Sequence, residues 1–261
     1  MLNKQGVVGV FFLGIITIFF LSYNIYLILK YRKKVRYALI FEEINLGFSN
    51  LHKIDRNNIE DEQTIGEYLI HLCDSISDSF TKINGHQIST CIKFLTFEEK
   101  RPKVLTLVRD RKSAVNNRKY GKADLTKHWL DRNTDFDFIY DKFDDDSIDT
   151  SFYYKTWLPV RKNYRNTRLK NWPPQYTPII NNIIRIAQWP LKYRSTLVVP
   201  IIPLIANDQK QEALRGFLCV DSPKCISFNK KIDVNILKGI SDGLYNKIDK
   251  LHNSINRNGK E

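Results

Sequence analysis

Cysteine, histidine and aspartate are the residues of this sequence that could do chemistry, and their spacing limits what that chemistry is. The cysteines, Cys73, Cys91, Cys219 and Cys225, form no CxxC pair and no regular series, so they indicate neither a zinc cluster nor a disulfide framework. Aspartates gather between residues 135 and 149, but the run Asp144, Asp145 and Asp146 lacks the alternating spacing and the closing Glu of a calcium loop. We therefore expect reduced thiols and no bound metal.

The sequence also lacks several of the motifs that carry enzymatic chemistry. GxGxxG, GxxxxGK and HExxH do not occur, and the five histidines are dispersed along the chain. His71 lies beside the apolar stripe of a predicted helix and His128 lies in a basic segment, so both are expected to be packing or surface residues. We expect a protein that is not an enzyme and that carries no cofactor.

The strongly basic balance suggests a nucleic-acid partner until the charges are located. Lys and Arg number 41 against 28 Asp and Glu, a net charge of +13, and six of the basic residues lie within the first 36 residues, where there is no acid. Between 155 and 170, basic residues alternate with aromatic ones, a pattern that could grip phosphates and stack bases. The Asp-rich run before it competes for the same charges. A nucleic-acid-binding membrane protein is therefore an alternative, and a disfavoured one.

The elements that must position these residues begin with a membrane span. Gly6–Leu29 contains no charged residue over 24 positions, and about 20 apolar residues cross a bilayer core. Five basic residues between Lys30 and Arg36 outnumber those on the other side, which places the following domain in the cytoplasm. We predict a single-pass protein of the cell membrane in contact with the lipid bilayer, with a transmembrane helix at 6–29, a basic flank and connecting helix at 30–62, and a cytoplasmic domain at 63–255.

Periodicity after the span predicts an α+β domain. Apolar residues recur at helical spacing over Tyr37–Leu51, over Ile65–Ile83, where Asn84 and Gly85 form a C-terminal stop, and over Ile232–Ile255. Strands are predicted at 87–95, 104–110, 152–158, 194–202 and 214–222, the last two as an antiparallel pair. The segment 111–151 is predicted to be loop-rich and to cover the sheet face opposite the helices.

Two details of the last strands carry further expectations. The strand at 194–202 is apolar on both faces, which predicts a central strand that is covered on each side. Gly216 is expected where a neighbouring backbone approaches too closely for a side chain. Asp221, Ser222 and Pro223 are interpreted as the turn that ends the strand.

Several strings, in this order, resemble the GAF family of sensor domains over Thr64–Ile248. YRSTLVVPI at Tyr193–Ile201 and GFLCVDSP at Gly216–Pro223 resemble the last two strands of a GAF sheet before its closing helix. RDR at 109–111, RNTDF at 132–136 and YRNTRLKNW at 164–172 resemble segments that line its variable face. The resemblance implies an N-terminal transmembrane helix followed by a GAF-like antiparallel sheet flanked by helices. It further implies a ligand held between the sheet and its variable cover, by Arg109, Asn133, Asp135, Tyr164, Asn166, Trp172, Arg194 and Ser195.

The function that follows is a non-catalytic sensor or signalling adaptor. Arg, Asn and aromatic side chains could hold a small ligand, for example a nucleotide, although the same residues could instead close loops over the sheet. Output would pass through association: a homodimer formed by the first and last long helices, and an effector protein encoded nearby. The family also includes a reductase of free methionine sulfoxide that uses cysteines, for which Cys91 and Cys219 are the candidates. That activity is disfavoured, because thiols buried on apolar strands are usually inert.

Overall fold

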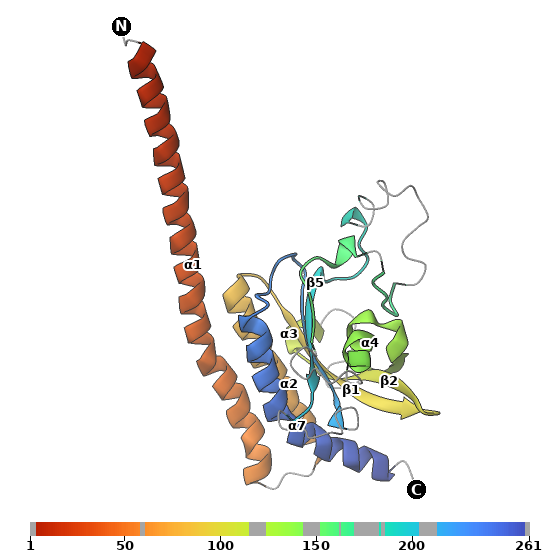
Figure 1. Ribbon diagram of the computed structural model, residues 1–261. Coiled ribbons are helices and arrows are strands. Elements are labelled where there is room, and N and C mark those ends of the chain that lie inside the picture. Colours follow the sequence, from red (N-terminus) through yellow and green to blue (C-terminus); the bar gives the residue numbers. More distant parts are fainter. Residues whose placement is uncertain are drawn as a thin grey trace.

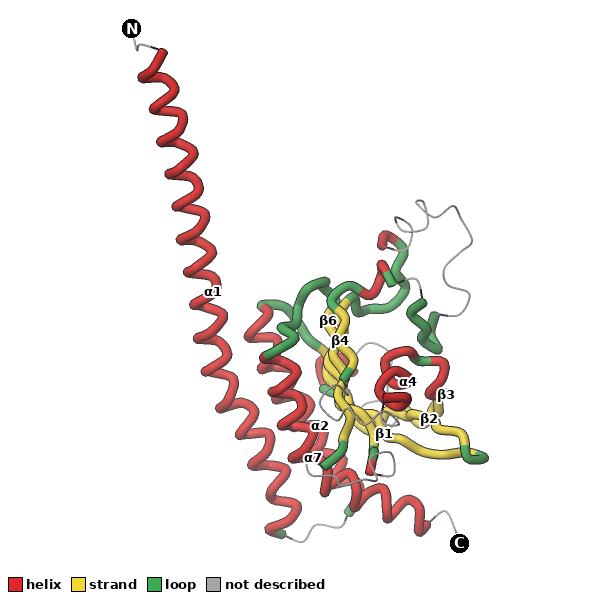
Figure 2. Tube along the Cα trace, in the orientation of Figure 1, coloured by secondary structure: helices red, strands yellow, loops and turns green. Residues whose placement is uncertain are grey.

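The computed structural model combines one long helix with an α+β domain packed against the second half of that helix (Figure 1). It describes residues 4–57, 61–114, 124–142, 152–161, 163–169, 183, 186–203 and 213–258. Within these residues the domain has three layers, in which helices cover one face of a sheet and loops with short helices cover the other (Figure 2). The predicted α+β class is confirmed.

Helix α1 (Lys4–Arg56) runs without interruption from the apolar segment into the domain. Its first half projects away from the domain, and the large apolar side chains from Val10 to Leu29 are exposed. This helix is long and apolar enough to cross a membrane. In its second half, Tyr37, Ile40 and Leu51 are buried in the core of the domain. The connecting helix predicted from the sequence is therefore the same helix as the apolar segment.

Helices α2 (Glu62–Asn84) and α7 (Ile232–Asn258) complete the helical layer. Asp61 caps the start of α2 by accepting the Thr64 N–H at 2.8 Å, which satisfies one of the unpaired donors of the first turn. Gly85 ends α2 in the left-handed conformation, with φ 71°, as the Asn-Gly stop predicts. The apolar stripes of α1, α2 and α7 meet one face of the sheet in a single hydrophobic core.

Six antiparallel strands form the sheet in the order β3-β2-β1-β6-β5-β4. They are β1 (Ser89–Glu98), β2 (Arg101–Arg109), β3 (Asp124–Trp129), β4 (Tyr153–Lys155), β5 (Ser195–Ile201) and β6 (Gly216–Ser222). The predicted pairing of β5 with β6 is confirmed, and β5 is buried along its whole length. A Cβ at Gly216 would collide with the Lys93 carbonyl oxygen of β1, which is the close approach expected from the sequence.

The cover of the opposite face differs most from the sequence prediction. The segment predicted to be loop-rich contains α3 (Arg111–Ala114), β3, a short turn η1 (Leu130–Arg132) and α4 (Thr134–Asp141). Strand β4 is shorter than predicted, because the chain turns at Leu158–Val160 (η4) with a proline in its first turn. Of this segment, η1 and α4 cover a second hydrophobic core on the opposite face, as predicted. In contrast, β3 forms the edge of the sheet, and α3 lies beside α2, where Arg111 and Lys112 bond to Asp74 and Asp78.

Candidate functional site

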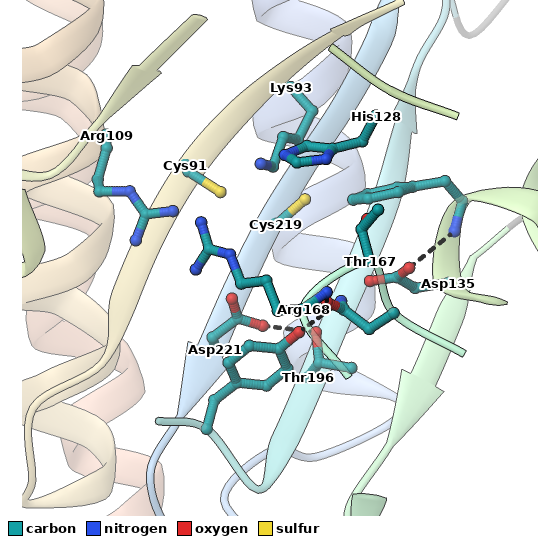
Figure 3. Close-up of a pocket in the computed structure, with 13 residues that line it drawn as sticks. Cys91, Lys93, Arg109, His128, Asp135, Thr167, Arg168, Thr196, Cys219 and Asp221 are labelled. Atoms are coloured by element: carbon teal, nitrogen blue, oxygen red, sulfur yellow. Dashed lines mark hydrogen bonds between the residues drawn. The ribbon is translucent and has the colours of Figure 1, made fainter. Parts of the chain in front are cut away.

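A small polar cavity lies on the sheet face opposite the long helices (Figure 3). Its volume is about 60 Å³, and the floor comes from β1, β2, β5 and β6 while α4 and the segment 166–168 form the cover. The lining residues are Cys91, Lys93, Arg109, His128, Asp135, Phe136, Asn166, Thr167, Arg168, Tyr193, Thr196, Cys219 and Asp221.

Strand alternation places the polar side chains on this face. Cys91 and Lys93 on β1 lie on the cavity side, whereas Ile92 between them belongs to the helix-side core. On β6, Cys219 and Asp221 likewise flank Val220. Each strand therefore contributes alternate residues to an apolar core and to a polar cavity.

Ladder register then brings these residues together. Cys91 lies directly opposite Cys219 on β6 and opposite Arg109 on β2. Asp221 lies opposite Thr196 on β5, whose hydroxyl donates a hydrogen bond to it at 2.6 Å. Residues from four separate strands thus converge on one place.

Two carboxylates in the cavity bind protons more tightly than carboxylates in water. Burial raises the pKa of Asp221 to about 7, and the charge of Cys91 adds to the shift. Burial likewise raises the pKa of Asp135, in the first turn of α4, to about 6. Near neutral pH both groups are therefore poised to exchange a proton.

Cationic side chains outnumber these carboxylates. Lys93, Arg109 and Arg168 all line the cavity. The Nε of Arg109 is buried and has no hydrogen-bond partner within the described part of the chain. These cations face three acidic groups, Asp135, Asp221 and the Cys91 thiol, whose pKa is lowered. Because Asp221 is still partly protonated near pH 7, the cavity keeps a small net positive charge there and favours an anion.

The Cys91–Cys219 pair lies among these cations (Figure 3). A hydrogen bond from Cys219 lowers the pKa of Cys91 to about 5, with further help from Lys93 and Arg109. Burial raises the pKa of Cys219 well above its ordinary value. Both thiols are buried in the second hydrophobic core, as expected for apolar strands, but they also line the polar cavity.

Hydrogen bonds hold the cover in place. The amide oxygen of Asn133, just before α4, accepts the backbone N–H of Thr167 at 3.2 Å and its hydroxyl at 2.8 Å. The hydroxyls of Tyr164 and Tyr193 lie 3.3 Å apart, and the Asn166 amide donates to Tyr193 at 3.1 Å. These contacts tie the start of α4 and the segment before β5 to the residues over the cavity.

The described residues predicted for the site divide into three groups, and one predicted residue is not described. Arg109, Asp135 and Asn166 line the cavity, while Asn133 and Tyr164 hold its cover. Arg194 and Ser195 do not line it: Arg194 donates to the Ile186 carbonyl at 3.1 Å and Ser195 to the Lys224 carbonyl at 2.8 Å, where they organise the start of β5. Trp172 lies outside the described residues, as do the aspartates at 144–146.

Other cavity residues were not predicted. Asp221 was interpreted as part of a turn, but it lies within β6 and lines the cavity. Lys93, Thr196 and His128 were also missed as cavity residues, although the period of two along each strand is a signal that could have found Lys93 and Thr196.

Outside the cavity, the string GISDG at 239–243 has the letters of the GxSxG nucleophile motif but not its structure. The string lies inside α7, where Ser241 is buried and donates a hydrogen bond to the Pro200 carbonyl.

Comparison with known proteins bears on the fold alone. No protein-family model and no curated protein sequence matches the chain. Two solved structures that resemble it are GAF domains of phosphoenolpyruvate-protein phosphotransferases. The one from Acinetobacter is 10% identical, and the match covers 80% of this chain and 98% of that chain with a TM-score of 0.41. The one from Coxiella burnetii is also 10% identical, and the match covers 82% of this chain and 96% of that chain with a TM-score of 0.43. The chromophore-binding domain of a bacteriophytochrome from R. palustris is also similar. It is 12% identical, and the match covers 82% of this chain and 62% of that chain with a TM-score of 0.42. These matches agree with the GAF-like fold expected from the sequence.

Proposed function

We propose that this chain is a membrane-anchored sensor whose polar cavity binds a small anionic molecule. The observation that carries this proposal is the convergence of Lys93, Arg109 and Arg168 on a cavity whose two carboxylates titrate near neutrality. The exposed apolar half of α1 supports the anchor, and the basic residues that follow it support a cytoplasmic domain.

The volume of the cavity narrows the class of ligand. About 60 Å³ has room for roughly four to six waters, or for an anion of a few heavy atoms. Pockets that enclose drug-sized ligands occupy about 300 to 1,000 Å³. The proposed ligand is therefore a small carboxylate or oxyanion, and a nucleotide would place only its phosphate here.

Continuity of α1 supports coupling between the cavity and the membrane. The same helix carries the apolar segment and contributes Ile40 and Leu51 to the core on the other side of the sheet. Tyr37 of α1 also donates to the buried Asp233 of α7 at 2.7 Å. A change in the sheet would therefore reach the proposed membrane helix through rigid packing.

Association with other proteins is the proposed output. The apolar faces of α1 and α7 expected to form a bundle between two copies are used within the domain's own core. A homodimer would instead use the side of α1 on which Val35, Leu39 and Leu46 remain exposed. A partner effector encoded nearby stays a proposal of the same kind.

The nucleic-acid alternative has little support from the described residues. Of the aromatic residues between 153 and 164 that could stack on bases, Tyr153 and Tyr164 are buried, and only Trp157 is exposed. Tyr154 donates its hydroxyl to the Phe228 carbonyl. Stacking on bases requires exposed rings.

One observation favours thiol chemistry as a second candidate function. Cys91 and Cys219 face each other across paired strands, beside cations that stabilise a thiolate. Such a pair could reduce a sulfoxide: two thiols and R₂S=O would give one disulfide, R₂S and water. Reduced chain incubated with free methionine sulfoxide should then release one methionine per chain and lose two hydrogens in mass. No methionine and no mass change would exclude this second function.

The ligand proposal is tested by thermal stabilisation of the full chain in detergent micelles. The probes are phosphate, sulfate, a panel of small carboxylates and a panel of nucleotides. A ligand at one hundred times its Kd stabilises the fold by about 2.7 kcal/mol. We expect at least one small anion to raise the melting temperature, and Arg168→Gln to remove that shift. The matched control is Lys192→Gln, which removes an exposed charge outside the cavity lining. Stabilisation by none of the probes would contradict the proposal.

A further inference from the structure

A second cavity lies between α1 and the neighbouring edge of the domain, and it shares no lining residue with the first. Its volume is about 380 Å³. It is lined by Leu29, Arg32 and Arg36 of α1, by the end of α2 and His86, and by Lys224–Ser227 between β6 and α7.

The charge on this cavity has one sign. Arg32, Arg36 and Lys224 line it, and no carboxylate does so among the described residues. Arg36 donates to the Ile83 carbonyl at 3.3 Å, which uses part of one guanidinium group. The side chains of Arg32 and Lys224 have no hydrogen-bond or ion-pair partner in the described part of the chain. Three converging cations without a counterion predict an anionic ligand.

His86 also lines the cavity, as a polar and uncharged side chain. Its Nε2 lies 2.8 Å from the Ser222 hydroxyl and 3.2 Å from that of Ser227. Burial lowers the pKa of His86, and the nearby Lys224 lowers it further. The imidazole is thus held by hydrogen bonds and contributes no positive charge near neutral pH.

The position along α1 fits a lipid headgroup. Leu29 ends the charge-free run, and at 1.5 Å per residue Arg32 and Arg36 lie roughly 4.5 and 10.5 Å further along the helix axis. The headgroup layer beyond the hydrocarbon core is about 5 to 8 Å thick on each side. In a membrane-spanning α1, Arg32 therefore lies within the headgroup layer, and the long side chain of Arg36, about one turn further along, can reach back toward it.

Exposed apolar side chains beside the cations point to a lipid surface as the source of the anion. Ile226 is 73% exposed and has a φ of 57°, a conformation that β-branched residues rarely adopt. The Ile226 N–H donates to the Thr156 carbonyl at 2.8 Å. Trp157, which follows Thr156 in the chain, is a second exposed apolar side chain in this region, with 42% of its surface accessible. A free phosphate would gain nothing from these side chains, whereas a bilayer interface would bury them.

We propose that Arg32, Arg36 and Lys224 form a binding site for the phosphate of an anionic phospholipid, with Ile226 seated in the surrounding lipid. This site rests on the membrane anchoring proposed above. It would fix the domain against the bilayer surface at a second point, besides the covalent continuation of α1. The position of the domain would then depend on the lipid composition of the membrane.

Native mass spectrometry of the full chain in detergent tests the site by counting retained lipids. With equal amounts of phosphatidylglycerol and phosphatidylcholine, we expect phosphatidylglycerol to be retained in roughly tenfold excess, because each cation near the bilayer surface attracts anionic lipid. Arg32→Gln with Lys224→Gln should remove the excess. The matched control, Lys34→Gln with Lys231→Gln, removes two exposed charges of the same two segments that do not line the cavity and should keep it.

Two further experiments distinguish failure of the lipid assignment from failure of the membrane anchor. Inorganic phosphate should not displace the lipid, and Ile226→Ser should weaken retention. Displacement by phosphate with no effect of Ile226→Ser would overturn the lipid assignment. Carbonate extraction tests the anchor itself: a chain released from membranes overturns the anchoring and this site together. A chain that stays embedded yet retains both lipids equally overturns this site alone.

Discussion

The two faces of the sheet are built from alternate residues of the same strands and each carries an apolar core, yet only the face toward α4 also holds a polar cavity. Toward α1, α2 and α7, the strands present Ile92, Leu218 and Val220 to a continuous apolar core. Toward α4, the same strands present Cys91, Lys93, Cys219 and Asp221 to a polar cavity. Buried charge costs stability unless it is compensated. The larger helix-side core therefore supplies most of the stability that allows the other side to hold charges for binding.

Removing a side chain from the helix-side core should have the largest effect. Phe80 of α2 is fully buried and contacts the ring of Phe228 edge to face. Phe80→Ala should lower the free energy of unfolding by about 3 to 5 kcal/mol, because it leaves a large cavity in the apolar core. Chemical denaturation measures this loss. Phe97→Ala, at an exposed ring on β1, is the matched control and should change stability little. Equal losses would contradict the assignment of stability to the helix side.

Glycine at the start of β6 should matter next most. A Cβ at 216 would meet the backbone of β1, so Gly216→Ala forces the two strands apart and should cost about 2 to 4 kcal/mol. Gly239→Ala is the control, because a Cβ added there would meet no atom of a neighbouring element within 4 Å, and alanine favours the helix. Denaturation midpoints of both variants provide the comparison. A harmless Gly216→Ala would show that β1 and β6 pair less closely.

The buried carboxylates of the polar cavity should make the free energy of unfolding depend on pH. Asp135 and Asp221 have pKa values of about 6 and 7 in the fold, above their ordinary value of 3.8. Between pH 4 and 7 the folded state thus binds more protons than the unfolded state, and this contribution to stability is full below pH 4 and lost as the pH rises through 6 to 7. Asp221→Asn should flatten part of this slope and stabilise the chain at pH 8 by about 1 to 3 kcal/mol. Denaturation at several pH values measures both. If Asp221→Asn leaves the pH dependence of stability unchanged, the Asp221 carboxylate is solvated in the folded state.

Thiol labelling should distinguish the two faces with the least disturbance of the fold. Cys73 lies in the helix-side core, where burial raises its pKa well above the ordinary value. Cys91 is equally buried, but the hydrogen bond from Cys219 lowers its pKa to about 5. Because the thiolate is the nucleophile, Cys91 should react with a small alkylating agent at pH 7 at least roughly tenfold faster than Cys73. Peptide mass mapping measures the two rates. Equal rates would remove the electrostatic distinction between the faces.

The sequence supports prediction where a signal is local. The stripes of α2 and α7, the Asn84-Gly85 stop and the paired strands β5 and β6 each depend on neighbouring residues, and all are present. The segment 111–151 was expected to be loop-rich, because β3 and α4 are short and their apolar residues show no long period. Such elements are fixed by the sheet edge and core they pack against.

The site was predicted in part for a similar reason. Arg109, Asp135 and Asn166 came from strings that resemble a family's variable face, and they do line the cavity. The facing pair Cys91 and Cys219 depends on the register of two strands that lie more than a hundred residues apart in the chain, and a one-residue slip would turn both side chains away. No local pattern contains that register.

The central claim, that the polar face of the sheet binds a small anion, is tested most directly by locating an anion in crystals. Selenate soaked into crystals of the chain can be found by its anomalous scattering. We predict a peak within hydrogen-bond distance of Arg109 and of either Lys93 or Arg168, and its loss in Arg168→Gln crystals. Peaks at exposed arginines and lysines with none in the cavity would contradict the account.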